Sequence, residues 1–399
     1  MVNASRRRRV GVAVVGLGGA VATTAVAGVE LMRRGANSMS GLPLADVAVP
    51  GLAGYEDLVF GGWDVNGQSL AAAAAEHHVL NDNQLAETEG ALALVTPWKA
   101  VASSAFCRRI GGGNMREMRG HRAAIDAIIS DIQQFKVAND LDDVVMINLA
   151  STERTPAEGE ALRTADGFQR ALDQDDPDIG PAMLYAAAAI EAGVAYGNFT
   201  PSVAADIPGL TELAERRGVP VAGKDGKTGQ TLLKTVLAPA FRARALHVDG
   251  WFSTNILGNR DGQALEDPDS LKSKLGTKGN VLDSILGYKV EDHLVDIRYY
   301  RPRGDDKEAW DNIDVSGFLG HKMQIKVNFL CKDSVLAAPL VLEIARVLDL
   351  ARQRGERGPQ EQLSLFFKAP MTAGKRAPEH AFHRQERMLA DWLGDKAGR

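Results

Sequence analysis

The chain has little cysteine: Cys107 and Cys331 are the only two among its 399 residues. Two thiols exclude a framework of disulfides and a zinc site with four cysteine ligands, and they fit a reducing compartment. An excess of charge of one sign is also lacking, since 46 Lys and Arg stand against 51 Asp and Glu. The formal net charge of -5 gives no general attraction to nucleic acid or to an anionic membrane. We therefore expect neither as a partner, and any affinity for anions must be local.

Long uninterrupted apolar runs are absent as well. The most apolar stretch, residues 10–28, follows the basic residues Arg6 to Arg9 and contains glycines at positions 11, 16, 18 and 19. Basic residues before an apolar run, with the small residues Ala25 to Ala27 behind it, resemble a secretory signal peptide. The glycines break the run too often for a membrane span, and the stretch also divides into a strand, a glycine turn and a helix. We therefore expect a cytoplasmic protein whose Arg6 to Arg9 segment is a solvated tail.

Alternating strand and helix patterns fill the first 240 residues. Short apolar runs predict strands at 10–15, 57–60, 143–149 and 219–222, with helices at 20–34, 71–78, 121–139 and 185–192 and a loop at 197–201. This alternation predicts an α/β fold with a doubly wound parallel sheet of Rossmann type. His77 and His78 are interpreted as surface residues of a helix, because no partner recurs at a metal-ligand spacing. No metal site is expected.

The pattern changes after about residue 240. Residues 293–300 and 321–331 alternate between apolar and polar side chains, which predicts half-buried strands of an antiparallel or mixed sheet. Helices are expected again at 334–354 and 381–393. A length of 399 residues exceeds what one core usually supports, so an inserted mixed α+β domain within the Rossmann-type fold accounts for the change.

A glycine turn follows the first predicted strand. Gly16, Gly18 and Gly19 let the backbone turn tightly and approach a pyrophosphate at the start of a helix, although Val21 occupies the usual third glycine position. Asp64 follows the second strand, where a Rossmann domain holds the adenosine ribose, and an insertion at 35–55 explains its distance from the turn. Ser151 and Thr152 follow the strand at 143–149, at the edge where open α/β sheets bind ligands.

Two lysines four residues apart, Lys274 and Lys278, would share one face of a helix. Like charges so placed repel each other, which an anion between them would reverse. The segment 223–230 contains glycines and lysines like a phosphate loop. It lacks the spacing of the nucleotide triphosphatase motif, which argues against such an enzyme.

Taken together, these segments resemble the inositol-3-phosphate synthase family, also called myo-inositol-1-phosphate synthase. The motifs that carry the resemblance occur in order over nearly the whole chain: Gly16–Gly19, Gly62–Asp64, Thr152–Glu153, Asp225 with Gly229–Thr231, Leu257–Gly262, Ser273–Lys274 with Lys278, Gly304–Lys307, Asp333–Ser334, and Lys368–Pro370 with Thr372. The resemblance implies an NAD-dependent conversion of D-glucose 6-phosphate to 1D-myo-inositol 3-phosphate. The implied steps are oxidation at C5, enolisation, intramolecular aldol closure and re-reduction, carried out by a homotetramer.

The resemblance also implies roles for particular residues. Catalytic roles fall to Lys274, Lys278, Lys307, Lys368, Asp261 and Asp333. Cofactor contacts fall to Gly16, Gly18, Gly19, Ala20, Val21, Asp64, Ser151, Thr152, Asp225, Asn259, Asp261 and Ser334. Substrate contacts fall to Thr228, Gly229, Gln230, Asn259, Lys274, Lys278, Lys307 and Lys368. The implied domains are an NAD-binding domain at 1–240, a catalytic and oligomerisation domain at 241–335, and a helical return to the first domain at 336–399.

Three other functions remain open at this point. Arg260 and the loop at 224–228 depart from the common family pattern, which motivates a related cyclase that acts on another sugar phosphate, such as fructose 6-phosphate. A simple NAD dehydrogenase would accumulate NADH in proportion to product. A non-enzymatic NAD sensor would have no need of four site lysines.

Overall fold

The computed structural model describes residues 7–108, 111–157, 159–258, 280–374 and 376–394. Asn259, Asp261, Lys274 and Lys278 therefore lie outside the described residues. Among the helices that the structure describes, none combines the length and the apolar character that crossing a bilayer requires.

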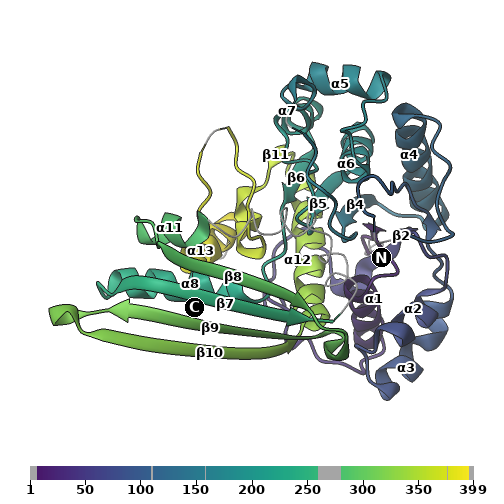
Figure 1. The fold of residues 1–399 in the computed structure, drawn as a ribbon. Coiled ribbons are helices and arrows are strands. Elements are labelled where there is room, and N and C mark those ends of the chain that lie inside the picture. Colours follow the sequence, from purple (N-terminus) through teal and green to yellow (C-terminus); the bar gives the residue numbers. More distant parts are fainter. Residues whose placement is uncertain (1–6, 109–110, 158, 259–279, 375, 395–399) are drawn as a thin grey trace.

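A seven-stranded sheet, parallel in every strand pair, forms the larger half of the molecule (Figure 1). Its strand order is β11 (Gly358–Pro359), β6 (Pro220–Gly223), β5 (Ala195–Asn198), β4 (Asp143–Asn148), β1 (Val10–Val15), β2 (Leu58–Asp64) and β3 (Trp98–Lys99). Read from β3, this is the order 3-2-1-4-5-6 of the doubly wound fold, with the switch in direction between β1 and β4. The predicted fold class is confirmed.

Helices cover both faces of this sheet because each strand alternates its side chains between two apolar layers. In β1, Ala13 and Val15 pack into one layer and Val12 and Val14 into the other. The first layer includes α4 (His121–Ala138), α5 (Ala165–Asp173), α6 (Pro181–Glu191) and α7 (Pro208–Arg217). The second includes α1 (Ala20–Arg33), α2 (Leu70–His77), α3 (Asp82–Ala93), α12 (Asp333–Gln353) and α13 (Phe382–Leu393).

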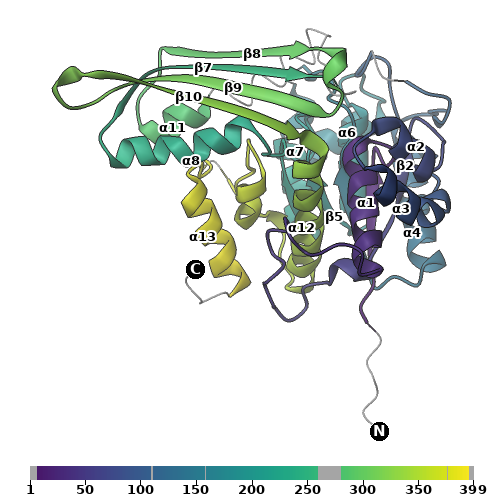
Figure 2. The same ribbon diagram turned by 90° about the horizontal axis from the view of Figure 1, so that it is seen from below.

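A second sheet of four strands extends from this half, in the order β10 (Lys322–Lys332), β9 (Asp306–Ser316), β7 (His247–Leu257) and β8 (Asp292–Tyr299). β7 and β8 are parallel, and the other neighbours are antiparallel. Figure 2 shows α8 (Gln230–Ala243) and α11 (Asn280–Leu286) on one face of this sheet, with no labelled element on the other. Trp251 and Ile313 of the sheet pack with Phe241 of α8 into a separate core.

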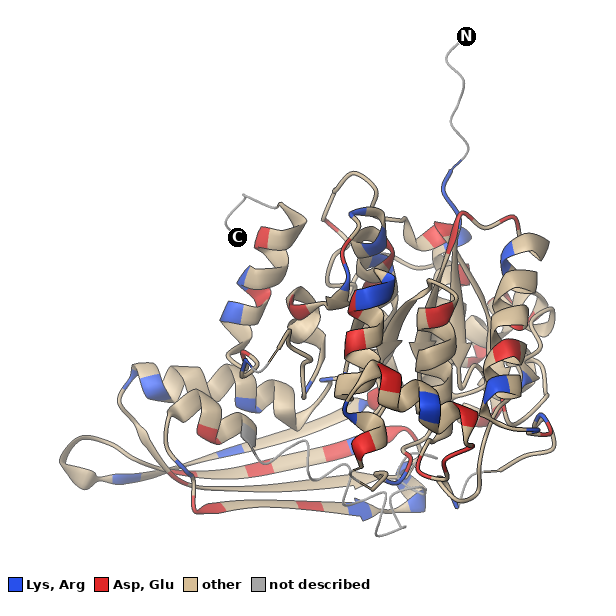
Figure 3. Ribbon diagram, turned by 90° about the horizontal axis from the view of Figure 1, so that it is seen from above, with Lys and Arg blue, Asp and Glu red and all other residues tan. Residues whose placement is uncertain are grey.

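Short 3-10 turns connect several of these elements: η1 (Tyr55–Asp57), η2 (Glu160–Leu162), η3 (Arg301–Arg303), η4 (Phe318–Gly320) and η5 (Glu361–Phe366). Figure 3 shows basic and acidic residues interspersed along the helices around the parallel sheet. This distribution agrees with the small net charge of the sequence.

One sequence expectation about the parallel sheet was wrong. Residues 195–198 form β5 within the parallel sheet, although Gly197 and Asn198 were assigned to a loop. A strand of four residues contains too little apolar alternation to outweigh its turn-forming composition. The strand expected at residues 10–15 is observed as the fully buried β1 between β2 and β4, in agreement with the interpretation of this stretch as a strand, a turn and a helix.

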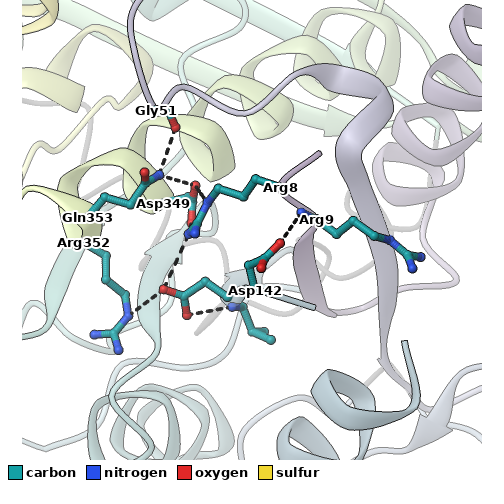
Figure 4. Close-up of polar contacts among 9 residues, drawn as sticks. Arg8, Arg9, Gly51, Asp142, Asp349, Arg352 and Gln353 are labelled. Carbon is teal, nitrogen blue, oxygen red and sulfur yellow. Dashed lines mark hydrogen bonds and ion pairs between the residues drawn. The ribbon is translucent and has the colours of Figure 1, made fainter. Parts of the chain in front are cut away.

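The basic residues before β1 do not form a solvated tail, as far as they are described. The Arg8 guanidinium lies 2.6 Å from Oδ1 of the fully buried Asp349, and the Arg9 N–H donates to Asp142 at 2.7 Å (Figure 4). The Gln353 amide donates to Asp349 at 2.8 Å and to the Gly51 carbonyl at 2.9 Å. These contacts join the start of the chain to α12. Burial of Asp349 requires a charged partner, which Arg8 provides.

Candidate active site

A cavity of about 610 Å³ lies at the carboxyl ends of β1, β2 and β4. This edge of the sheet, beside the switch between β1 and β4, is where doubly wound sheets bind ligands. The cavity brings together most of the described residues that the sequence assigns to the site: Gly16, Gly19, Ala20, Val21, Asp64, Ser151, Thr152, Asp225, Thr228, Lys307, Asp333, Ser334 and Lys368. Two elements far apart in the sequence, the glycine turn and the Lys368 loop, thus face one space.

The glycine turn forms one end of the cavity. Gly16 has a φ of 88°, and a Cβ atom there would lie 3.0 Å from the Ala150 nitrogen, so a side chain would be strained and crowded. The Gly16 N–H donates to the Trp63 carbonyl at 2.8 Å, and the Gly19 N–H donates to the Gly16 carbonyl at 3.0 Å. α1 begins directly afterwards at Ala20, without a side-chain cap. Its first N–H groups can therefore bind an anion.

Gly18 belongs to the same turn but does not line the cavity. Its N–H donates to Asp64 Oδ2 at 2.9 Å, and Asp64 Oδ1 accepts the Asn66 N–H at 2.9 Å. Asp64 thus faces the cavity while it also holds the turn. Carboxylate oxygens are the acceptors that a ribose hydroxyl requires.

His77 and Glu153 line the cavity but were not predicted as site residues. His77 was assigned to the surface, yet its Nε2 lies 2.7 Å from the Gly18 carbonyl oxygen. Sequence spacing holds no signal for this contact, which joins residues 59 positions apart. Glu153 belongs to the Thr152–Glu153 motif, which could have identified it. Burial raises the pKa of Glu153 to about 8, although its Oε1 accepts the Ala182 N–H at 3.1 Å.

Two lysine–carboxylate pairs form the other end of the cavity. Lys368 Nζ lies 2.6 Å from Asp225 Oδ1, and both side chains are more than nine-tenths buried. The backbones of these two residues are joined as well, because the Lys368 N–H donates to the Asp225 carbonyl at 2.7 Å. Lys368 follows η5 and Asp225 follows β6, so the pair lies at the carboxyl end of β6.

The second pair joins the two sheets. Lys307, near the start of β9, places Nζ 3.2 Å from Oδ1 of Asp333, the first residue of α12. The Thr228 hydroxyl donates to the same oxygen at 3.1 Å. Ser334 donates from its hydroxyl and its N–H to Asp305, at 2.7 and 3.1 Å. One aspartate thus positions Lys307 and Thr228, and a second fixes the start of α12.

A small recess of about 20 Å³ adjoins the lysine end and includes Gly229 and Gln230 in its lining. Lys307 and Lys368 line both this recess and the large cavity. Gln230 Nε2 donates to the Thr254 carbonyl at 2.9 Å, and its Oε1 accepts from Asn255. The predicted substrate residues Thr228, Gly229 and Gln230 therefore form the turn before α8 and its first residue, directly beside the two lysines.

Buried lysines support this turn from behind. Burial lowers the pKa of Lys227 to about 7, and its Nζ contacts Gln385 of α13. One turn into α8, burial lowers the pKa of Lys234 to about 8, and its Nζ lies 2.7 Å from His293 Nε2. Within the described residues, no group of three or more His, Cys, Asp and Glu side chains is arranged to hold a metal ion.

Comparison with known proteins decides the family. Residues 41–394 match the family model described as myo-inositol-1-phosphate synthase, an NAD-binding family. The chain belongs to the myo-inositol-1-phosphate synthase family. It is an NAD-binding enzyme of inositol-3-phosphate synthase type.

Two curated relatives and one crystal structure illustrate the likeness. Inositol-3-phosphate synthase 1 of Bacteroides thetaiotaomicron is 40% identical, covering 98% of this chain and 96% of the relative. Inositol-3-phosphate synthase of Saccharomyces cerevisiae is 30% identical, covering 84% of this chain and 70% of the relative. The crystal structure of inositol-3-phosphate synthase from Caenorhabditis elegans superposes with a TM-score of 0.90 at 26% identity, covering 97% of this chain and 86% of that one.

Proposed function

We propose that the enzyme converts D-glucose 6-phosphate to 1D-myo-inositol 3-phosphate without net oxidation. The observation that carries this proposal is the pairing of Lys307 with Asp333 and of Lys368 with Asp225 at the end of the cavity away from the glycine turn. Cations held in place beside a nucleotide cavity suit a reaction in which negative charge develops on sugar oxygens. The relatives are inositol-3-phosphate synthases, which supports the same reaction.

The residues at the glycine turn fit a bound dinucleotide. Gly16 and Gly19 have no side chains that would cover the backbone at the start of α1. Asp64, the last residue of β2, lines the cavity beside the turn. We assign the pyrophosphate to the N-terminus of α1 and the adenosine ribose to Asp64. Ser151, Thr152, Asp225 and Ser334 then lie along the remaining path of the cofactor. NAD, when bound, supplies the acceptor for the hydride of C5 and later returns that hydride.

The lysines carry the remaining chemistry in this proposal. Lys368 donates a hydrogen bond to the C5 oxygen and takes part in proton transfer, while Asp225 holds its ammonium group in place. Lys307 contacts the phosphate or a neighbouring hydroxyl, oriented by Asp333. The N–H groups of Gly229 and Gln230 at the start of α8 favour an anion there. We expect Lys274, Lys278, Asp261 and Asn259 to complete the site.

The deciding experiment follows inositol phosphate and NADH together. Purified enzyme receives glucose 6-phosphate and less NAD than substrate. Many turnovers for each NAD without net NADH would support the cyclisation. Stoichiometric NADH would show a dehydrogenase instead. If the enzyme turned over fructose 6-phosphate but not glucose 6-phosphate, fructose 6-phosphate would be the substrate.

A pair of lysine variants assigns the chemistry to the site. Lys368→Met is expected to lower turnover at least about 100-fold, which is typical for the loss of one group that stabilises developing negative charge. Lys136→Met is the matched control, because Lys136 is exposed on α4. Equal turnover by the two variants would contradict the role of Lys368.

We also propose that the second sheet forms the interface of a homotetramer. Its uncovered face carries Phe252, Leu294, Trp310 and Leu330, which are 36 to 60% exposed. Phe252 and Leu294 are register partners, and the rings of Phe252 and Trp310 lie 5.6 Å apart, so these side chains form one apolar surface. Such a surface is typical of a subunit interface. Light scattering should show a smaller assembly for Trp310→Asp; a monomeric wild-type protein would refute the proposal.

We further propose that the chain divides into domains at residues 240 and 335. We also propose a cytoplasmic location. Each sheet has its own apolar core, which supports a division into domains, although α8 crosses the boundary at 240 and places Ala238 in the core of the second sheet. Limited proteolysis tests the boundaries. The free thiols of Cys107 and Cys331 suit a reducing compartment, which cell fractionation tests.

A further inference from the structure

Both polar backbone groups of Gly18 are held by side chains. The N–H donates to Asp64 Oδ2 at 2.9 Å, and the carbonyl oxygen lies 2.7 Å from His77 Nε2. A carbonyl oxygen can only accept a hydrogen bond, so His77 must carry a proton on Nε2. His77 is the last residue of α2, and its imidazole lines the cavity.

The Gly18 carbonyl matters because it shares a rigid peptide plane with the N–H of Gly19. Rotation of this plane would move the Gly19 N–H away from the Gly16 carbonyl, which it contacts at 3.0 Å. It would also direct the Gly18 carbonyl oxygen at the Gly16 carbonyl, because the two polar groups of a trans peptide point in opposite directions. Two oxygens that face each other repel, so the flip would disrupt the turn that precedes α1.

The turn has few other restraints on this peptide plane. Gly18 and Gly19 have no side chains, and α1 begins without a side-chain cap. Ala20 and Val21 follow, and neither side chain can donate a hydrogen bond. Orientation of the Gly18–Gly19 peptide therefore depends strongly on a group outside the turn.

We propose that His77 is a positioning residue for NAD. Its Nε2–H holds the Gly18 carbonyl against α2, and the first N–H groups of α1 consequently remain directed at the pyrophosphate. Asp64 holds the other side of Gly18, so the two side chains act together on one residue. This inference rests on the proposed placement of the pyrophosphate at the glycine turn.

The experiment compares His77→Ala with His77→Gln. Glutamine keeps an N–H donor at similar reach, whereas alanine removes it. After removal of any bound dinucleotide, equilibrium dialysis measures NAD affinity without reference to the sugar reaction. Ala75→Gln is the matched control, because residue 75 is exposed on the same helix.

We expect His77→Ala to weaken NAD binding about three- to tenfold, the usual effect of one lost hydrogen bond. His77→Gln should recover at least part of this loss. The KM for NAD should rise while kcat at saturating NAD changes little, and Ala75→Gln should bind like the wild-type enzyme.

Three results would overturn the inference. His77→Ala could bind NAD as tightly as the wild type, or both His77 variants could weaken binding equally. A loss of kcat together with a lower unfolding temperature without NAD would show a merely structural role. Wild-type enzyme that binds NAD but does not cyclise glucose 6-phosphate would contradict the proposed reaction and leave this test intact.

Discussion

Lys234 provides a quantitative test of the buried charges behind the active site. The residue is 3% exposed, and burial lowers its pKa from 10.5 to about 8. This shift corresponds to about 3 kcal/mol. Below pH 8 the lysine is charged in both the folded and unfolded states, so the folded state bears the full cost. The cost disappears as the pH rises from 8 through 10.5, the pKa of the unfolded chain.

Replacement of Lys234 by Met removes both this cost and the hydrogen bond to His293. A lost hydrogen bond costs about 1 kcal/mol, so we expect a net stabilisation of about 2 kcal/mol at pH 7. That gain should raise the unfolding temperature by a few degrees. It should shrink above pH 8 and change sign near about pH 10.

Differential scanning fluorimetry of both proteins from pH 6.5 to 10 measures the difference directly. The comparison cancels the titration of groups that the two proteins share. Lys136→Met, at an exposed position of α4, should give a difference close to zero at every pH. A difference between Lys234→Met and the wild type that does not vary with pH would refute the reasoning.

Three further predictions concern stability and ligand binding. Burial raises the pKa of Glu153 from 4.5 to about 8, so the cost of burying its charge is absent below pH 4.5 and grows as the pH rises through 8. Glu153→Gln should therefore unfold at a higher temperature than the wild type at pH 9 and at a similar temperature at pH 5. Glu343→Ala leaves the buried Arg346, now 2.6 Å from Glu343, without its charged partner and should lower the free energy of unfolding by about 3 to 5 kcal/mol in chemical denaturation, whereas Glu343→Gln should cost less. Lys274→Ala should abolish turnover while NAD stays bound, and wild-type rates would contradict its assignment.

Much of the parallel sheet could be predicted because its strands are short apolar runs set between helices. β1 and β4 were predicted within one residue of their observed ends, since both are flanked by clear turn signals. β7 and β9 were not predicted although each has 11 residues. Both carry polar side chains that the fold buries, such as Ser253 and Asp311, which are joined at 2.5 Å. A sequence pattern of apolar and polar residues assigns a polar residue to the exposed face. The buried polar residues therefore hide the alternation that would have predicted these two strands.

The candidate site shows the same division between local and distant information. The turn before α8 is contiguous, and the resemblance assigns its residues Thr228, Gly229 and Gln230 to the substrate. Lys307 and Lys368 are assigned by the resemblance alone, because nothing in their local sequence distinguishes them from exposed lysines. The carboxylates that hold these lysines come from other elements: Asp333 from α12 and Asp225 from the loop after β6. His77 was missed for the same reason, because its partner is a backbone carbonyl and leaves no signal in the sequence.

Charge balance in the described part of the site bears on the residues that lie outside it. Lys307 and Lys368 are each paired with a carboxylate, so these four side chains contribute no net charge. A sugar phosphate brings nearly two negative charges. The N-terminus of α8 provides about half a positive charge, which is too little to balance them. We propose that Lys274 and Lys278, which lie outside the described residues, supply the remainder together with Arg301, which also lines the cavity. Loss of Lys278 should therefore raise the KM for the sugar phosphate far more than the KM for NAD, and an equal rise in both would show that the charge comes from elsewhere.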